Sequence, residues 1–131
     1  MRERLVKSVP ALVILVALGA MAACDSSQPK AASGGAPVPA DLQTGEAKFN
    51  SNCAVCHGPQ GTGTQQGPPL VHKIYEPNHH GDAAFQRAAA NGVRAHHWEF
   101  GNMPKIDGVT PDEVDHIIRY VRWLQKQAVI F

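Results

Sequence analysis

The sequence predicts an all-α domain with three main helices and long loops between them. The strongest indication is the segment 114–124, where apolar residues recur at helical spacing and form one stripe. A second helix-prone run covers residues 82–90 and is followed by Asn91-Gly92, a common helix stop. Residues 58–81 are rich in Gly and Pro and lack the alternation of a strand, so we expect a long loop there.

The starts of two helices can be predicted from their capping residues. Thr110-Pro111-Asp112-Glu113 is a capping box with proline in the first turn, and it precedes the last helix. Asp41 or Thr44 is expected to cap the first helix, which runs through Phe49 toward Cys53.

Cys53-Ala54-Val55-Cys56-His57 is the motif with the most specific chemistry. In a helical turn, Cys53, Cys56 and His57 stand at positions i, i+3 and i+4 and share one face. Each thiol can form a thioether with one vinyl group of a haem while the imidazole ligates the iron. The motif therefore predicts one covalently attached haem c. A bound haem also gives the long loop 58–81 a group to wrap.

A Cys-x-x-Cys pair has other uses, namely a zinc site, a thioredoxin-like redox pair or a structural disulfide. A four-cysteine zinc site is excluded because Cys24 is the only further cysteine. A site of two cysteines and two histidines would need spaced histidines downstream, whereas His79-His80 and His96-His97 are adjacent pairs.

The chain resembles the class I c-type cytochromes over residues 40–127. Gly45 and Phe49 lie eight and four residues before the first cysteine, as a glycine and an aromatic residue do in that family. Ile117 and Tyr120 match the apolar and aromatic pair of the family's last helix, against which the first pair packs. The resemblance implies a class I cytochrome c fold, with three main helices and long loops wrapped around one covalently bound haem.

The resemblance also implies the residues on both sides of the iron. Gly67-Pro68-Pro69-Leu70 matches the family's Gly-Pro-x-Leu loop, so the Pro68 carbonyl should accept a hydrogen bond from the non-ligating nitrogen of His57. Met103 is the expected sixth ligand, since it lies in a short turn before the last helix, 46 residues after His57. A thioether opposite histidine raises the reduction potential relative to two histidines.

Several histidines leave alternatives open. His96, His97 and His116 are rivals of Met103 for the sixth position, with His96 and His97 close to it in sequence. The pairs His79-His80 and His96-His97 could also bind a second metal together, because imidazole suits both copper and zinc.

Three further residues are candidates for contacts with the haem propionates. Trp98, Tyr75 and Arg94 carry an indole N–H, a phenol and a guanidinium, all of which suit a buried carboxylate. Simple packing of the two aromatic residues and a solvated surface position for Arg94 are the alternatives.

Residues 1–23 are predicted to be an export signal. Three basic residues lie within residues 2–7, and residues 9–23 are uncharged and apolar but too few for a comfortable membrane span. Export agrees with the haem motif, because thioether attachment of haem takes place on the far side of the membrane.

Signal cleavage has two possible routes. Met21-Ala22-Ala23-Cys24 resembles a bacterial lipobox, in which the cysteine is lipidated, although leucine is more usual than methionine at its first position. Ordinary cleavage after Ala22 would leave Cys24 as a free thiol in an oxidising compartment. We therefore expect a lipid anchor at Cys24 on the periplasmic side of the bacterial cytoplasmic membrane, with a soluble periplasmic protein as the alternative.

The mature chain divides into a tether and one domain. Residues 24–40 are expected to be a flexible tether rich in Ala, Ser, Gly and Pro, and residues 41–131 a monohaem domain. From residue 24 onward the chain has nine Lys and Arg and ten Asp and Glu, with no basic stripe that would indicate nucleic acid.

These features predict an electron carrier and not an enzyme. A six-coordinate iron has no open position for a substrate, and no acid–base constellation can be identified. Expected partners are a quinol-oxidising complex as donor and a terminal oxidase or other reductase as acceptor, in transient contact. The alternatives are a haem subunit of a larger oxidase or dehydrogenase, and a haem protein that binds CO, NO or peroxide if Met103 is labile.

Overall fold

A computed structural model describes residues 36–131 of the chain. The expected signal (1–23), the lipidation site Cys24 and the tether up to residue 35 lie outside the described residues. The last residues assigned to the tether belong to the folded part, because Val38 packs against the core and Ala40 begins a helical turn.

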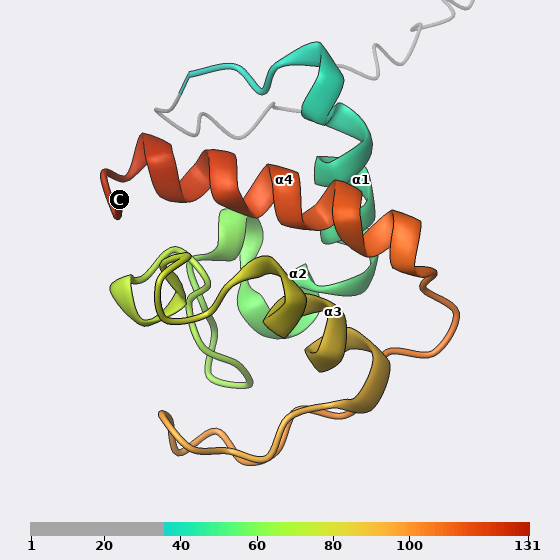
Figure 1. The fold of residues 1–131 in the computed structure, drawn as a ribbon, viewed down its shortest axis with the longest axis vertical. Helices are drawn as coiled ribbons and strands as arrows, with labels where there is room; N and C mark the ends of the chain where they lie inside the picture. Colours follow the sequence, from blue (N-terminus) through green and yellow to red (C-terminus); the bar gives the residue numbers. More distant parts are fainter. Residues whose placement is uncertain (1–35) are drawn as a thin grey trace, which may run out of the picture. The chain divides into compact units, whose positions relative to one another are not determined.

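Residues 36–131 form helices joined by loops, which confirms the predicted all-α class (Figure 1). The three longest helices are α1 (Gln43–Asn52), α3 (Asp82–Asn91) and α4 (Pro111–Gln127). The shorter elements are α2 (Ala54–His57) and the 3₁₀ turns η1 (Ala40–Leu42), η2 (Pro59–Gly61) and η3 (Lys73–Tyr75). No helix of this described part is long and apolar enough to cross a membrane.

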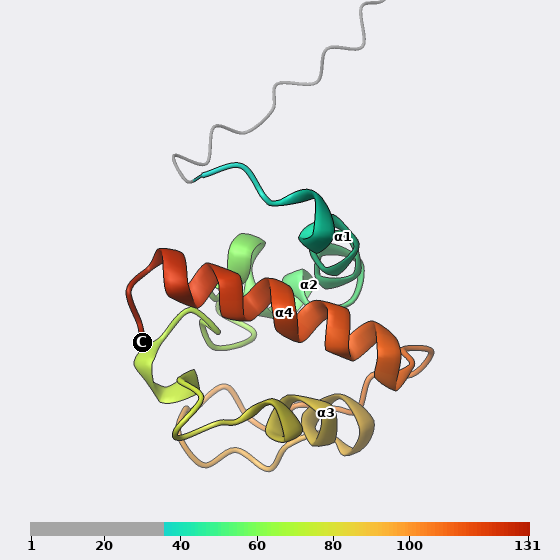
Figure 2. The same cartoon turned by 45° about the horizontal axis from the view of Figure 1, so that its top comes forward.

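Helices α1 and α4 cross at close contact, as both views show (Figures 1 and 2). Gly45 lies against the backbone of α4, and a Cβ atom at this position would be 2.1 Å from the carbonyl oxygen of His116. Phe49, one turn later, is fully buried, and its ring centroid lies 5.6 Å from that of Tyr120. The expected packing of the glycine and aromatic positions against the last helix is therefore present.

The predicted start of α4 is correct, whereas that of α1 is wrong. Thr110 and Glu113 form the reciprocal hydrogen bonds of a capping box. Helix α1 begins after Leu42 and has no side-chain cap, so neither Asp41 nor Thr44 has that role. The reason is the preceding helical turn, where the Pro39 carbonyl accepts from the N–H of Leu42 and the Ala40 carbonyl accepts from the N–H of Gln43.

A buried polar network joins α4 to the loop between α2 and α3. Gln125 is fully buried and donates to the carbonyl oxygen of Leu70 at 2.8 Å, while its own oxygen accepts from Arg122 at 2.7 Å. Arg122 also donates to the Tyr75 carbonyl at 2.6 Å and to Asp82 at 2.8 Å. The network fixes the loop that carries Tyr75 over one side of the site.

Candidate haem-binding site

A largely apolar cavity of about 930 Å³ opens between α2, α3, α4 and the loops that follow α2 and α3. Its volume is near the upper end of the range of about 300–1,000 Å³ that is typical of ligand and cofactor sites. Every site residue that the sequence predicted within 36–131 lines this cavity: Cys53, Cys56, His57, Pro68, Tyr75, Arg94, Trp98 and Met103. His116 does not line it and instead lies beside Arg119 on α4, with 2.7 Å between Nδ1 of His116 and Nη2 of Arg119.

His57 is oriented by one hydrogen bond. Its Nδ1 lies 2.8 Å from the carbonyl oxygen of Pro68, the pair that the family resemblance implies. Because a carbonyl only accepts, Nδ1 carries the proton and Nε2 keeps a free lone pair. Burial lowers the pKa of His57, and the hydrogen bond to Pro68 opposes this shift. A neutral imidazole with its Nε2 free is the form that ligates a metal.

The two cysteines precede His57 on the same turn, and both are free and partly buried. The backbone N–H of His57 donates to the carbonyl oxygen of Cys53 at 2.9 Å, which closes the turn. Burial raises the pKa of Cys53 to about 11, and the neighbouring Cys56 contributes to this rise.

Met103 is held at the cavity by its backbone. Its N–H donates to the carbonyl of Val93 at 2.9 Å, and the N–H of Val93 donates back at 2.9 Å, which forms an isolated antiparallel bridge. Gly92 makes this pairing possible, because its φ is +74° and a Cβ there would be 2.5 Å from the Met103 carbonyl oxygen. The sequence identified Gly92 only as a helix stop and gave no sign of this second role.

Trp98 and Tyr75 line the cavity and carry an indole N–H and a phenol that can form hydrogen bonds. The indole Nε1 of Trp98 is buried and has no hydrogen-bond partner in the structure. Burial raises the pKa of Tyr75, and the nearby Trp98 indole opposes that rise, although the pair lacks the geometry of a normal hydrogen bond. A buried N–H requires an acceptor, and a propionate would supply one. Arg94 lines the cavity but is exposed.

These residues fit a covalently bound haem. The cavity offers two thiols and a neutral imidazole on one turn, a thioether from a separate loop and a buried N–H without an acceptor. The surrounding apolar lining suits the porphyrin ring.

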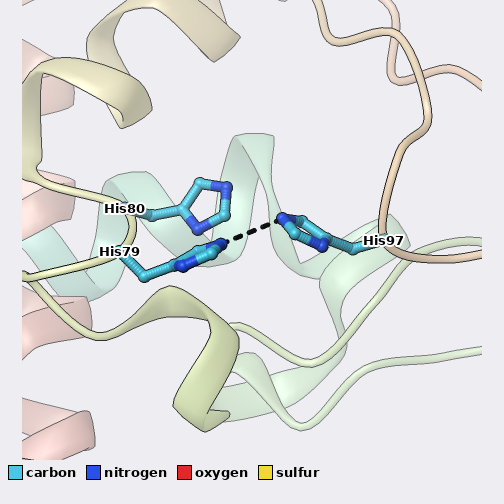
Figure 3. A group of neighbouring side chains, drawn as sticks. All are labelled: His79, His80 and His97. Atoms are coloured by element: carbon cyan, nitrogen blue, oxygen red, sulfur yellow. Dashed lines mark hydrogen bonds between the residues drawn. The ribbon is translucent and has the colours of Figure 1, made fainter.

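The histidines of the two adjacent pairs, His79-His80 and His96-His97, also line the cavity, and three of them form a cluster. The nitrogen atoms that His79, His80 and His97 can offer to a metal all lie within 4.8 Å of one another (Figure 3). His96 is a neighbour of this group but not a member of it. Partial desolvation lowers the pKa of the exposed His97, and the three neighbouring histidines lower it further.

Comparison with known proteins identifies the family. Searches of curated proteins and of solved structures find no significant match. The sequence model of the family described as "Cytochrome c" matches residues 42–125, which cover the chain from the end of η1 to near the end of α4. The chain therefore belongs to the cytochrome c family of electron-transfer proteins and carries a single covalently bound haem c.

Proposed function

We propose that the protein carries single electrons through one haem c whose iron is ligated by His57 and Met103. The observation that supports this most directly is that both side chains line one cavity, with Nδ1 of His57 engaged by Pro68 and Nε2 left free. Haem-based electron transfer is the general activity of the family.

The chain's own residues hold the group and tune it. Cys53 and Cys56 would hold the haem through two thioethers, each formed when the sulfur and hydrogen of one thiol add across one vinyl group. The Pro68 carbonyl fixes the orientation of the His57 ring and increases its basicity as a ligand. When bound, the haem would supply an iron that can take up and release one electron, and ligation by the Met103 thioether would favour the reduced form.

The structure also has features that suit exchange of electrons with a partner. Val55 lies between the two cysteines, lines the cavity and is 72% exposed. The edge of the haem that these cysteines hold would therefore lie near the molecular surface. A small, transient contact at this edge would be sufficient for electron transfer.

Binding of carbon monoxide to the reduced, haem-loaded protein tests the closed site. If Met103 ligates the iron, the wild-type protein binds little CO during the time in which the Met103→Ala variant binds it completely. Rapid and complete binding by the wild type would contradict the proposal and would favour a ligand-binding haem protein.

We also propose that the domain works at the periplasmic side of the cytoplasmic membrane, anchored through a lipid on Cys24. The support for this comes from the sequence alone, namely the apolar leader and the lipobox-like Met21–Cys24 segment. A quinol-oxidising donor and a terminal oxidase or other reductase as acceptor fit such a position. Mass spectrometry of the mature N-terminus tests the anchor, and an unmodified Cys24 would contradict it.

A further inference from the structure

Two separate loops bring imidazole nitrogens together beside the haem cavity. His79 and His80 precede α3, whereas His97 lies on the loop between α3 and Met103 (Figure 3). Nε2 of His79 and Nε2 of His97 are 3.2 Å apart. Two nitrogens bound to one tetrahedral zinc at about 2.0–2.1 Å lie roughly 3.3–3.4 Å from each other, so the observed separation is close to that of a shared ion.

A hydrogen bond between the rings of His79 and His97 would explain the 3.2 Å distance, but it would not explain why the ring of His80 lies beside them. A ligand nitrogen of His80 also lies within 4.8 Å of the nitrogens of His79 and His97. Nδ1 of His80 is 2.6 Å from the carbonyl oxygen of Ile74, so Nδ1–H donates there and Nε2 keeps its lone pair. Metal-ligating histidines are typically fixed in this way by a backbone carbonyl.

His96 has a different role from its neighbour. Its Nδ1 lies 2.8 Å from the carbonyl oxygen of Arg94 in its own loop, and its ligand atoms fall outside the group of three. The structure thus selects three of the four histidines in the two adjacent pairs.

We propose that His79, His80 and His97 form a second metal site that binds one divalent late-transition-metal ion, with Zn²⁺ as the probe and Cu²⁺ as a competitor. Three neutral imidazoles are a ligand set for these ions. His79 and His97 are exposed, so water can occupy the fourth position.

An ion at this site would link two loops that lie on the haem cavity. His79 and His80 follow η3, which contains Tyr75, and His97 precedes Trp98 and Met103 in the sequence. Because the ion would bind the folded arrangement more tightly than the unfolded chain, it would stabilise the domain and restrain the loop of Met103.

The test is titration of the purified haem-loaded protein with Zn²⁺ by calorimetry, together with X-ray absorption at the zinc edge, which the haem iron does not obscure. We expect one Zn²⁺ per protein and imidazole nitrogens at about 2.0–2.1 Å. His79→Ala and His97→Ala should each lower the affinity at least about 100-fold, since even outer contacts of metal ligands contribute about 10–100-fold. His116→Ala, which alters a histidine outside the cluster, should leave the affinity unchanged.

The haem spectrum of each variant shows whether its fold and iron ligation are retained. His79 and His97 are chosen because they are exposed, whereas the carbonyl of His80 accepts from Arg122 and its ring is packed against Tyr75. A variant that no longer binds zinc but keeps the weak far-red sulfur-to-iron band of methionine ligation would show that the zinc site is separate from the iron. Three results would each overturn the proposal. The zinc could be coordinated mainly by oxygen, His97→Ala could leave the zinc affinity unchanged, or His96→Ala could lower that affinity as much as His97→Ala does.

Discussion

At the scale of single residues, backbone contacts orient the two residues that we propose as iron ligands. The carbonyl of Pro68 determines which nitrogen of His57 is free, and the bridge to Val93 fixes the backbone of Met103. Gly92 permits that bridge, because it has a positive φ and no side chain in the way of the Met103 carbonyl. The two proposed iron ligands are thus positioned by residues that are not ligands themselves.

Replacement of Gly92 by alanine tests this dependence. The added Cβ would clash with the Met103 carbonyl at 2.5 Å, so we expect Gly92→Ala to weaken the Met103 ligation and to increase CO binding by the reduced protein. Gly108→Ala is the matched control, because Gly108 has a φ of +81° but a Cβ added there would have no atom within 4 Å. Both variants carry a backbone cost of about 1–2 kcal/mol, and the clash should add about 1–3 kcal/mol to Gly92→Ala alone. Equal stability and equal CO binding in the two variants would contradict the assignment.

At the scale of the elements, the crossing of α1 and α4 supports the site from outside the cavity. Gly45 allows the close approach, and an ion pair between Lys48 and Glu113 joins the two helices at their surface. Glu113 also accepts a hydrogen bond from the backbone N–H of Thr110, so one carboxylate caps α4 and ties it to α1. The hydrogen bond from Lys48, followed by that from Thr110, lowers the pKa of Glu113 to about 2.

This shift predicts a contribution of Glu113 to acid stability. Because its pKa is lower in the folded state than the ordinary value of 4.5, its stabilising effect is complete above pH 4.5 and is lost as the pH falls toward 2. Glu113→Gln keeps an oxygen that can cap Thr110 but removes the charge. The free energy of unfolding of this variant, measured by denaturant titration, should therefore depend less on pH across that interval than that of the wild type. Glu99→Gln, at an exposed loop position, is the control. If the free energy of unfolding of Glu113→Gln depended on pH as strongly as that of the wild type, Glu113 would make no such contribution to acid stability.

At the scale of the whole molecule, elements far apart in the sequence meet around the cavity, and this limits what the sequence alone could predict. The capping box, the stop at Gly92 and the Gly45–Phe49 pair are local patterns, and each corresponds to a feature of the structure. The sequence did not reveal that α1 lacks a side-chain cap at Asp41 or Thr44. Backbone carbonyl groups of the preceding turn accept hydrogen bonds there instead.

Long-range contacts account for most of what the sequence did not reveal. Arg122 and Gln125 look like polar positions of an amphipathic helix, yet both are buried and bind loop carbonyls. Two pairs of adjacent histidines indicated a second metal only in general terms. Which three of these four histidines come together, and that His96 is left out, depends on how the two loops approach each other.

Loss of the Gln125 side-chain amide tests the polar network. In Gln125→Leu the Leu70 carbonyl loses its donor and Arg122 loses an acceptor, both in buried surroundings. We expect the free energy of unfolding to fall by about 1–3 kcal/mol, the cost of leaving a buried polar group unpaired. Gln127→Leu, at an exposed position near the end of the same helix, should change it by less than about 0.5 kcal/mol. Denaturant titration of the haem-loaded proteins distinguishes these outcomes, and equal effects would show that the network contributes nothing specific.

The absorption spectrum of the oxidised, haem-loaded protein tests the central claim most directly. Met103 is the only methionine after residue 21, so a sulfur-to-iron band can arise from no other methionine of the mature chain. We predict a weak far-red band in the wild type and in His97→Ala, and its loss in Met103→Ala. A wild-type spectrum without the band, or a band that persists in Met103→Ala, would contradict ligation of the iron by His57 and Met103.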